Sequence, residues 1–594
     1  MTKRYLITTA DERTWLYNRP VLFLGEWCRH DDRQQIWAEM DATLASPYGL
    51  QNGEKDRDQA YVLDLSKRLI CELTHSLNAF HKTKYSLRFW HIVLGHWIQR
   101  YVSVLFNRYS TLNHAIQNYL IDGTTIINAD CYSLATNDTD DFIWACNDSL
   151  WNHVLYGKIL CYLDGIEVNS IKIDIPKSFR SEQELTPPFT SSCWKKLILS
   201  RVVQLLPKLS RKTDAFIINS YLPRLEEMKL ALKLRQSPQL WRSPHLKKAE
   251  INQKNRQRFK INFVGYAGFE LFLRKQLIEM LPICYLEGFE QLMQQVNELP
   301  WPKSPKFIFT SNNFDTDEIF KVWTGSKVEQ GVPYFVGQHG NNYGTSKEVI
   351  IPETQNCDKY FSWGWTNENP KIIPAFMFKK FGSTSFKADP DGGLLLIETS
   401  RPHRIATYDN DHNFVIYQKE QFRFVDALSQ DIQQKLTIRL SVSKQSNYCE
   451  NQWRDRLPLV SVERGKMKIE TLIQKSRLVV YSYDSTGILE TLAFNIPTIC
   501  FWHGGLDHLL PHAIPFYEML REVKIIVDTP EQAAKLITMH WNNIDQWWKN
   551  KKLQDARKMF CNEFARIDKR GLKLLKKLFI THIDPNKMME FAIS

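Results

Sequence analysis

A stretch reading Ser-Tyr-Asp-Ser-Thr-Gly directly follows the apolar run 478–481, which predicts a β-strand. Hydroxyl and carboxylate side chains at such a position cap the next helix, whose free amides and positive dipole end attract anions. We therefore predict that Ser485, Thr486 and the backbone at Gly487 hold a phosphate group. One helical turn later, Glu490 is placed to accept hydrogen bonds from ribose hydroxyls. An ordinary helix cap without a ligand fits the same pattern.

A single histidine lies between glycines after a second apolar run, 334–337. Gly340 and Gly344 follow His339 closely, so we predict a sharply turned loop at the carboxyl end of its strand. An imidazole at this position suits a general base or a group that contacts phosphate. A purely structural histidine is the alternative interpretation.

Cationic side chains gather after a third apolar run, 394–397, and after the strand predicted next to it. An anion clamp needs several such donors at neighbouring strand ends. Taken singly, each of them also fits ordinary surface charge. The residues that we predict to bind the donor phosphate in this way are Arg401, His403, Arg404, Arg439 and Lys444.

Two carboxylates in the first half of the chain are candidates for a nucleophile or a base. Glu26 follows an apolar run among aromatic residues, and Asp148 precedes a helical pattern. Burial raises the pKa of a carboxyl toward the range that acid–base catalysis requires. Asp148 equally fits a helix cap. If the protein transfers a group to a sugar-containing acceptor, we expect that acceptor to contact three residues. Trp27 could stack on a sugar ring, and His91 and His153 could contact the acceptor as well.

Spacings that would hold a metal or a cofactor are weak in this sequence. His503, His508 and His512 lie close together, but Pro511 interrupts any helix that would align the last two. The chain has neither a Gly-x-Gly-x-x-Gly fingerprint nor a Walker-type phosphate loop. We predict that the protein uses no metal and no cofactor.

Short apolar runs that alternate with helical patterns predict an α/β fold with parallel sheets. Two strands are expected in the first 30 residues, and further strands are expected at 307–310, 334–337, 359–362, 394–397, 436–440, 478–481, 498–501 and 524–528. We assign residues 1–385 to an acceptor-side Rossmann-like domain and residues 386–594 to a donor-nucleotide-binding Rossmann-like domain. The two domains would face a cleft between them.

The first domain carries a helical insertion at about 64–300. Apolar residues recur at helical spacing from 64 to 109 with a break near 82–86, which predicts two packed helices. The most apolar part, 89–106, includes His91 and other polar groups that are costly in lipid, so we interpret it as a buried helix. Further helices are predicted at 151–163 and 194–206.

The chain of 594 residues carries a net charge of +12, concentrated in 208–260, where 14 Lys/Arg stand against 4 Asp/Glu. Such a segment can meet anionic lipid or phosphorylated substrates, and it equally fits a solvated helical hairpin. It lacks stacking aromatics, so we expect no nucleic-acid partner. The start of the chain does not resemble a signal peptide, and the 11 cysteines have no Cys-x-x-Cys spacing. We expect a cytoplasmic protein with peripheral contact to the inner membrane.

The order of these motifs resembles bacterial GT-B-like transferases of surface-polymer synthesis. His339-Gly340 after a strand, a linker at 379–393, a Pro and Arg cluster, and a Ser-x-x-Ser-Thr turn before a helix are similar to features of teichoic-acid glycerophosphotransferases, polysialyltransferases and capsular Kdo transferases. The resemblance implies that His339 is catalytic or contacts the donor. It also implies that Ser485 and Thr486 bind the donor phosphate.

Four segments look like a transferase family of O-antigen gene clusters, and this likeness spans nearly the whole chain. They are 6–10, 21–28, 89–95 and 337–340. The chain lacks the Thr-Asp-Tyr-Ser-Ser form of the glycerophosphotransferases, so their donor is not carried over to it.

These observations together favour a glycosyltransferase that takes a nucleotide sugar, such as a CMP-activated ulosonic acid, and transfers it to a glycan or lipid-linked glycan of O-antigen or capsule. His339, Glu26 or Asp148 would handle proton transfer or nucleophilic attack. One alternative is a CDP-alcohol phosphotransferase of teichoic-acid type. Another is a non-catalytic glycan-binding or assembly protein at the inner membrane.

Overall fold

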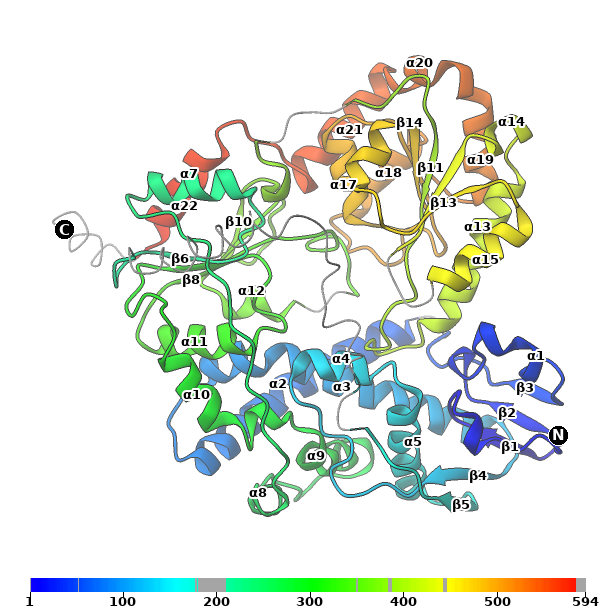
Figure 1. The fold of residues 1–594 in the computed structure, drawn as a ribbon, viewed down its shortest axis with the longest axis vertical. Helices are drawn as coiled ribbons and strands as arrows, with labels where there is room; N and C mark the ends of the chain where they lie inside the picture. The colour runs from blue at the N-terminus through cyan, green and yellow to red at the C-terminus, as the bar shows by residue number, and fades with distance from the viewer. Residues whose placement is uncertain are drawn as a thin grey trace, which may run out of the picture.

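The computed structural model describes residues 2–51, 53–176, 179, 210–348, 351–382, 387–441 and 446–583. Within these residues the chain forms an α/β fold with three parallel sheets, which are separated along the chain and covered by helices (Figure 1). The prediction of an α/β fold with Rossmann-like parallel sheets is confirmed. The grouping of the strands differs from our expectation, as described below.

The first sheet is built from the N-terminal region and has the strand order β3-β2-β1-β4-β5. All its neighbouring strands run parallel, with Tyr5 opposite Val21 on one side and Gly123 on the other. Its strands are β1 (Arg4–Ile7), β2 (Val21–Phe23), β3 (Ala42–Leu44), β4 (Ile121–Ile127) and β5 (Val168–Ile171).

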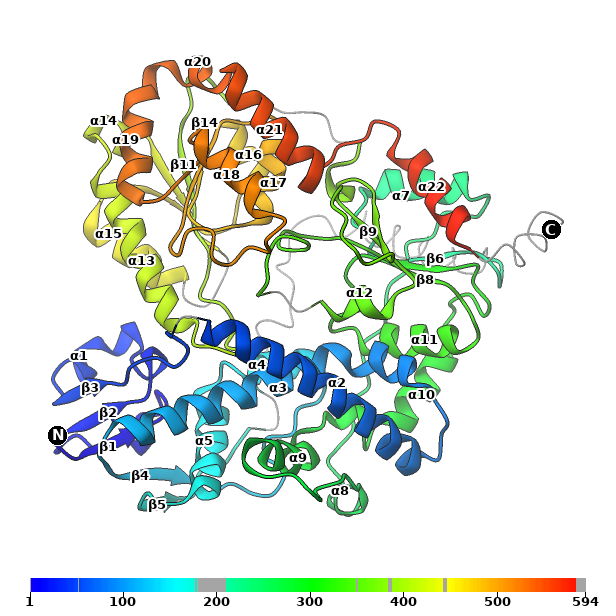
Figure 2. The same ribbon diagram turned by 180° about the vertical axis from the view of Figure 1, so that it is seen from behind.

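Two long helices, α2 (Glu54–His81) and α3 (Leu87–Asn118), connect β3 to β4 and run side by side (Figure 2). The predicted break between them is confirmed. Lys82 ends α2 in the left-handed region at φ 55°, and the Ser86 side chain caps α3 by accepting a hydrogen bond from the Phe89 amide. Much of α3 is buried, which confirms that its apolar part belongs to the protein core. No helix among the described residues is both long and apolar enough to cross a membrane.

The second sheet has the strand order β10-β9-β8-β7-β6. Its phenylalanine-rich face packs against α7 (Arg224–Lys233) and α22 (Gly571–His582), where Phe579 stacks on Phe307 and Phe335. Its strands are β6 (Phe216–Ile217), β7 (Ile308–Thr310), β8 (Tyr334–Gly337), β9 (Lys359–Ser362) and β10 (Ile372–Pro374), and α11 (Glu318–Glu329) and α12 (Pro352–Asn356) follow β7 and β8.

The third sheet has the strand order β13-β12-β11-β14-β15-β16, all parallel. Its helices include α13 (Asp411–Asp426), α15 (Ser446–Arg456), α17 (Thr486–Ala493), α19 (Pro530–His540) and α21 (Lys551–Phe564). Its strands are β11 (Gly393–Ile397), β12 (Leu436–Arg439), β13 (Ser461–Glu463), β14 (Ser476–Tyr481), β15 (Thr498–Phe501) and β16 (Ile526–Val527).

The described part of 1–385 therefore contains two separate five-stranded sheets, whereas we expected its strands to form one Rossmann-like unit. The region 64–300 also holds β4, β5 and β6, so it is not a purely helical insertion. Apolar runs predict strands but not the strands with which they pair. Here β1 pairs with β4, although α2 and α3 lie between them in the sequence. The helix predicted at 194–206 lies outside the described residues.

Candidate functional site

The loop that carries His339 contacts the turn that starts α17, so the carboxyl-end loops of the second and third sheets meet. The Asn341 amide donates to Thr486 Oγ1 at 2.9 Å, and the Asn341 side chain donates to Asp484 Oδ1 at 2.6 Å. A short antiparallel bridge between Ser346 and Leu509 extends the contact. The sequence prediction that these two motifs belong to one region is consistent with this geometry.

The loop after β8 is held in shape by its own backbone requirements. Asn342 and Gly344 adopt φ angles of 71° and 69°, and a Cβ at Gly344 would lie 2.3 Å from the Trp365 ring, so only glycine fits there. Gln338 fixes the start of the loop, since its side chain donates to Gly340 O at 2.8 Å and accepts from the Trp363 amide at 2.8 Å. The sharply turned loop that the glycines predict is present.

The turn before α17 leaves one hydroxyl unused. Ser485 is the N-cap residue in an extended conformation, and its side chain makes no capping hydrogen bond. Its Oγ is buried and makes no hydrogen bond of good geometry among the described residues, although it lies close enough to the Tyr483 hydroxyl to oppose the burial that raises the pKa of Tyr483. Asp484 is held by His508 Nε2 at 3.0 Å and by the Tyr517 hydroxyl at 3.1 Å. Buried hydroxyls without a partner are costly, which makes the Ser485 Oγ a candidate ligand contact.

His339 is joined to a chain of buried polar groups. Its Nδ1 lies 3.3 Å from the Tyr343 hydroxyl, which donates to Glu353 Oε1. The other carboxylate oxygen of Glu353 lies 3.0 Å from His96 Nε2. Burial, reinforced by the Glu353 charge, holds the pKa of Tyr343 well above its ordinary value, so the phenol stays neutral and donates.

The surroundings of His339 favour the neutral form of its imidazole. Burial lowers the pKa of His339 below its ordinary value of 6.5, against the opposing effect of Glu353 and Asp315. Burial also acts to raise the pKa of Asp315, but the Arg100 guanidinium, bound at 2.6 and 3.0 Å, holds it well below the usual range. A neutral imidazole next to two fixed carboxylates can accept a proton near pH 7.

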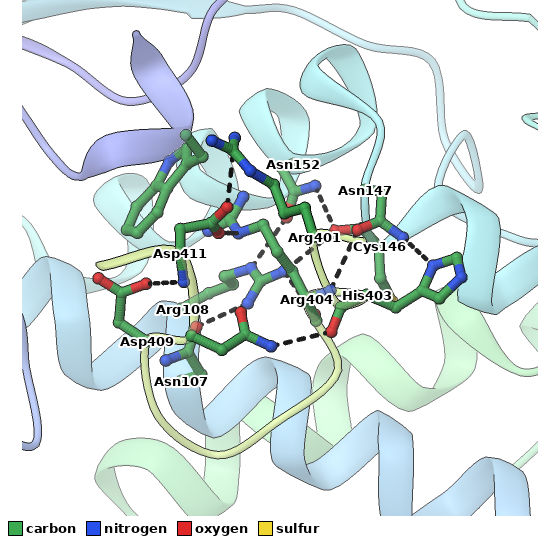
Figure 3. Close-up of polar contacts among 12 residues, drawn as sticks. Asn107, Arg108, Cys146, Asn147, Asn152, Arg401, His403, Arg404, Asp409 and Asp411 are labelled. Atoms are coloured by element: carbon green, nitrogen blue, oxygen red, sulfur yellow. Dashed lines mark hydrogen bonds and ion pairs between the residues drawn. The ribbon is translucent and has the colours of Figure 1, made fainter. Parts of the chain in front are cut away.

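The Arg401–Arg404 segment forms a different kind of contact, shown in Figure 3. Arg404 is 8 % exposed, and its guanidinium lies 3.1 Å from Asp411 Oδ2, 3.2 Å from the Tyr156 hydroxyl and 3.8 Å from the Trp27 ring. Arg108 of α3 donates to the Arg404 carbonyl at 2.9 Å. Arg404 thus ties the third sheet to the first sheet and to α3, and its charge is already compensated.

The two neighbours of Arg404 are also engaged with protein groups. His403 Nδ1 contacts the Asn147 side chain, and Arg401 lies 3.4 Å from Asp411 Oδ1. Arg401 keeps a buried Nε without a hydrogen-bond partner, so of the three it is the one with a free donor. We expected all three to clamp an anion, and for Arg404 and His403 the structure shows contacts with residues of the first sheet region instead.

Three further residues were predicted to bind the donor, namely Arg439, Lys444 and Gly487. Arg439 binds Glu463 at 3.1 Å and donates to its neighbour Leu440 O, and Lys444 lies outside the described residues. At Gly487 a Cβ would lie 2.5 Å from the Tyr481 ring. Its absence makes room for Tyr481, so the expected approach of a ligand to this backbone is not the reason for the glycine.

Glu490 already has two cationic partners. Lys379 and Lys380, from the segment between the second and third sheets, both place their amino groups 2.8 Å from its carboxylate. The predicted contact with ribose hydroxyls would compete with these lysines. Glu490 therefore holds the segment that contains Lys379 and Lys380, which connects the second and third sheets, against α17.

In the N-terminal sheet, Trp27 is buried at 6 % exposure and donates its indole N–H to Thr8 O at 2.9 Å. It packs under Arg404 and therefore offers no face to an acceptor sugar, contrary to our expectation. Glu26 forms an ion pair with Arg29. Asp148 caps α5 (Ser149–Leu163) by accepting from the Trp151 amide at 2.8 Å, which is the cap that we held as the alternative.

The two acceptor-side histidines lie apart from the loop of His339. His153 is buried at 2 % exposure, with Nδ1 3.0 Å from the Thr8 hydroxyl, and burial lowers its pKa to about 4. A group so enclosed packs the first sheet and cannot reach an acceptor. His91 lies half-buried on α3 and its carbonyl accepts from the Asn356 side chain at 3.0 Å. Burial lowers the pKa of His91 as well.

Sequence reasoning missed the groups that support His339. His96 and Glu353 are 257 positions apart in the sequence, and nothing local marks either as a partner of the histidine. Asn341 and Tyr343 lie inside the glycine-rich segment that we selected, and their polar side chains were the available signal.

The sequence and the fold of this protein are also similar to those of known proteins. A family model described as LIC12162 family transferase matches residues 4–579. A search of curated proteins finds no match.

Several solved structures are similar at low identity, and at these values the likenesses carry no conclusion about chemistry. MurG of Acinetobacter baumannii is 10% identical, with 62% of this chain and 99% of that chain covered and a TM-score of 0.33. The wall teichoic acid polymerase TagF is 10% identical, with 67% and 96% covered and a TM-score of 0.31. The spinosyn rhamnosyltransferase SpnG is 10% identical, with 49% and 78% covered and a TM-score of 0.27.

Proposed function

This chain belongs to the LIC12162 family of transferases, and we propose that it transfers a sugar from a nucleotide-activated donor to a surface-polysaccharide acceptor. The donor class that we propose is a CMP-activated ulosonic acid of Kdo or sialic-acid type. The acceptor is a glycan or lipid-linked glycan of O-antigen or capsule. Transfer breaks the bond between the anomeric carbon and the phosphate oxygen, forms a bond to an acceptor hydroxyl oxygen, and releases the nucleotide.

The observation that carries this proposal is the unpartnered Ser485 hydroxyl at the start of α17, next to the loop of His339. A phosphate oxygen placed there would accept a hydrogen bond from Ser485 and would lie at the positive end of the helix dipole. Thr486 Oγ1 accepts from the Asn341 amide, so its own hydroxyl hydrogen is free to donate to the same phosphate. Arg401 follows β11, the strand next to β14, and keeps an unpaired Nε, so we propose it as the cation that complements this charge.

His339 is the proposed base for the acceptor hydroxyl. Its pKa below 6.5 keeps the imidazole neutral and able to accept the proton that the hydroxyl loses on attack. Tyr343 and Glu353 would orient the ring and stabilise the imidazolium that forms, in the way that a carboxylate positions a catalytic histidine. They act as positioning residues because they contact His339 and not the reacting atoms.

For the acceptor, a hollow of about 500 Å³ lies at the carboxyl end of β1, lined by Asp11, Arg13, Arg33 and Asp148 among others. Hydroxyl-rich glycans bind through such mixed sets of carboxylate and guanidinium groups. Because Asp148 lines this hollow, we propose it as an acceptor contact in addition to its role as the cap of α5.

Nucleotide binding tests the proposal directly. We expect CMP to raise the thermal midpoint of the protein more than CDP, UDP or GDP does, because binding to the folded state stabilises it. If none of the four shifts the midpoint, a non-catalytic glycan-binding or assembly protein replaces the enzyme. If CMP or CDP binds, product analysis with CMP-Kdo and CDP-glycerol separates sugar transfer from the phosphoryl transfer of a CDP-alcohol phosphotransferase.

A further inference from the structure

Helices α7 and α22 lie side by side on the outer face of the second sheet (Figures 1 and 2). Together they expose both apolar and basic side chains. The inner face of α22 buries Leu572, Leu575 and Phe579 against the sheet. The outer face of α7 exposes three apolar side chains, with Leu225 at 70%, Met228 at 38% and Leu232 at 63% exposure. Their spacing of three and four places them in one stripe along the helix.

A basic hollow borders this apolar stripe. It has a volume of about 430 Å³ and is lined by Lys233, Lys573, Lys576, Lys577, Ile580 and Thr581. None of the four lysine amino groups has an ion pair or a hydrogen bond with the residues that the structure describes. The α22 sequence, Gly-Leu-Lys-Leu-Leu-Lys-Lys-Leu-Phe-Ile-Thr-His, contains no acidic residue.

The acidic residues of α7 do not neutralise these lysines. Glu226 is paired with Lys229 at 2.7 Å, and Glu227 is bound to the Ser220 hydroxyl. The surface formed by α7 and α22 therefore carries a net positive charge beside a stripe of exposed leucine and methionine. An anionic bilayer complements both features, because its phosphates attract the lysines and its acyl chains accept the leucine and methionine side chains. A soluble partner of ordinary composition would complement only one of the two.

We propose that this α7–α22 surface docks the protein on an anionic phospholipid membrane. Leu225, Met228 and Leu232 would enter the boundary between headgroups and acyl chains, and the four lysines would lie among the phosphates. Each basic residue near an anionic surface strengthens binding by roughly fivefold at low salt. The proposal does not depend on the sugar donor, because it concerns a face distinct from the His339 loop.

Vesicle flotation with the full-length protein tests this assignment. We expect binding to vesicles that contain phosphatidylglycerol, little binding to pure phosphatidylcholine, and release as salt is raised. The variant Lys573→Glu/Lys577→Glu should bind roughly tenfold more weakly or worse. Leu225→Ser/Leu232→Ser should weaken the binding that persists at high salt, because it removes the apolar part.

Lys552→Glu/Lys558→Glu is the matched control, since these exposed lysines lie on α21 and the charge change is the same. It should float like the wild type. If the wild type fails to float with phosphatidylglycerol, or if Lys573→Glu/Lys577→Glu floats equally well, the assignment is wrong. All four mutated lysines are solvent-facing or line the hollow, so unchanged thermal midpoints should confirm that the variants are folded.

Discussion

Two contacts between the sheet regions of this protein, both formed by loops at strand ends, differ in how their polar groups are paired. The contact between the His339 loop and the α17 turn leaves a buried hydroxyl, Ser485 Oγ, without a partner. In the contact around Arg404 the guanidinium charge is compensated by the Asp411 carboxylate, as Figure 3 shows, and the guanidinium also contacts the Tyr156 hydroxyl and the Trp27 ring. Cationic or hydroxyl side chains at a strand end therefore indicate a ligand site only when their hydrogen-bonding capacity remains unused.

The difference has a physical consequence for substitutions. In the Arg404 contact the charged groups join the third sheet to the first sheet and α3, and removing one leaves its partner buried and unpaired. In the Ser485 turn the hydroxyl makes no hydrogen bond of good geometry with the protein, so we expect its removal to affect ligand binding more than stability.

Removing the carboxylate of Asp411 should have the largest effect on stability. Asp411→Ala would leave Arg401 and Arg404 buried beside each other without their shared counter-charge. Breaking a buried pair in this way costs about 3 kcal/mol or more. We expect a clearly lower thermal midpoint, measured by circular dichroism, with bound CMP changing the wild type and the variant by similar increments. A midpoint equal to that of the wild type would mean that the cluster does not hold the domains together.

His339→Gln should reduce turnover about a hundredfold, the usual contribution of a general base. The pKa of His339 is lowered by burial, so the imidazole is neutral and active above this lowered pKa and becomes inactive as the pH falls through it. The acid limb of the rate profile should therefore lie below 6.5 in the wild type and vanish in the variant. Initial rates measured across pH test both points.

His81→Gln is a suitable control for that substitution. Burial also lowers the pKa of His81, but its Nε2 contacts the Tyr285 carbonyl at 2.9 Å and its ring packs against Phe289. The variant should keep the acid limb of the profile. Loss of the limb in both variants would point to general destabilisation and against a base at His339.

The local elements of the fold were accessible from the sequence. Strands such as β8, β11 and β14 and the break between α2 and α3 follow from apolar runs and periodicity, which depend only on neighbouring residues. The separation into three sheets was not accessible, since the pairing of β1 with β4 brings together residues more than a hundred positions apart. No apolar pattern encodes which strand becomes the neighbour.

The same limit applies to the candidate site. The His339 loop and the Ser485 turn were predicted because glycines and capping residues act locally. Arg404 was predicted for the same local reason, yet its role is decided by Trp27 and Tyr156, which come from another sheet and another helix. Glu353, which supports His339 through Tyr343, has no signature of its own in the sequence.

Ser485→Ala should weaken nucleotide binding about tenfold, the scale of one hydrogen bond to a charged group. Because the Ser485 Oγ has no protein partner, the thermal midpoint without ligand should be unchanged or slightly raised. Titration calorimetry with CMP measures the first effect, and a thermal scan measures the second.

Thr529→Ala provides the contrasting helix cap. Thr529 caps α19 of the same sheet and accepts from the Gln532 amide at 3.2 Å, so its loss should cost about 1 kcal/mol of stability without changing CMP affinity. The opposite pattern, with Ser485→Ala destabilising the protein and binding CMP normally, would make Ser485 an ordinary cap.

Glu490→Gln should have the smallest effect. It tests whether Glu490 contacts the ligand, as proposed for Ser485, or forms a structural ion pair, as Arg404 does. Its carboxylate lies one turn beyond Ser485 but is bound by Lys379 and Lys380. Lys380 keeps Glu470 at 3.3 Å as a counter-charge, Lys379 is half-exposed, and the glutamine can still accept a hydrogen bond, so we expect a loss of about 1 kcal/mol in stability and no change in CMP affinity. If Glu490 instead binds the ribose hydroxyls, the variant would bind CMP more weakly while its affinity for inorganic phosphate stayed the same. Parallel titrations with CMP and phosphate distinguish these outcomes, because only the nucleotide carries the ribose, and they define how far along α17 the ligand contact extends.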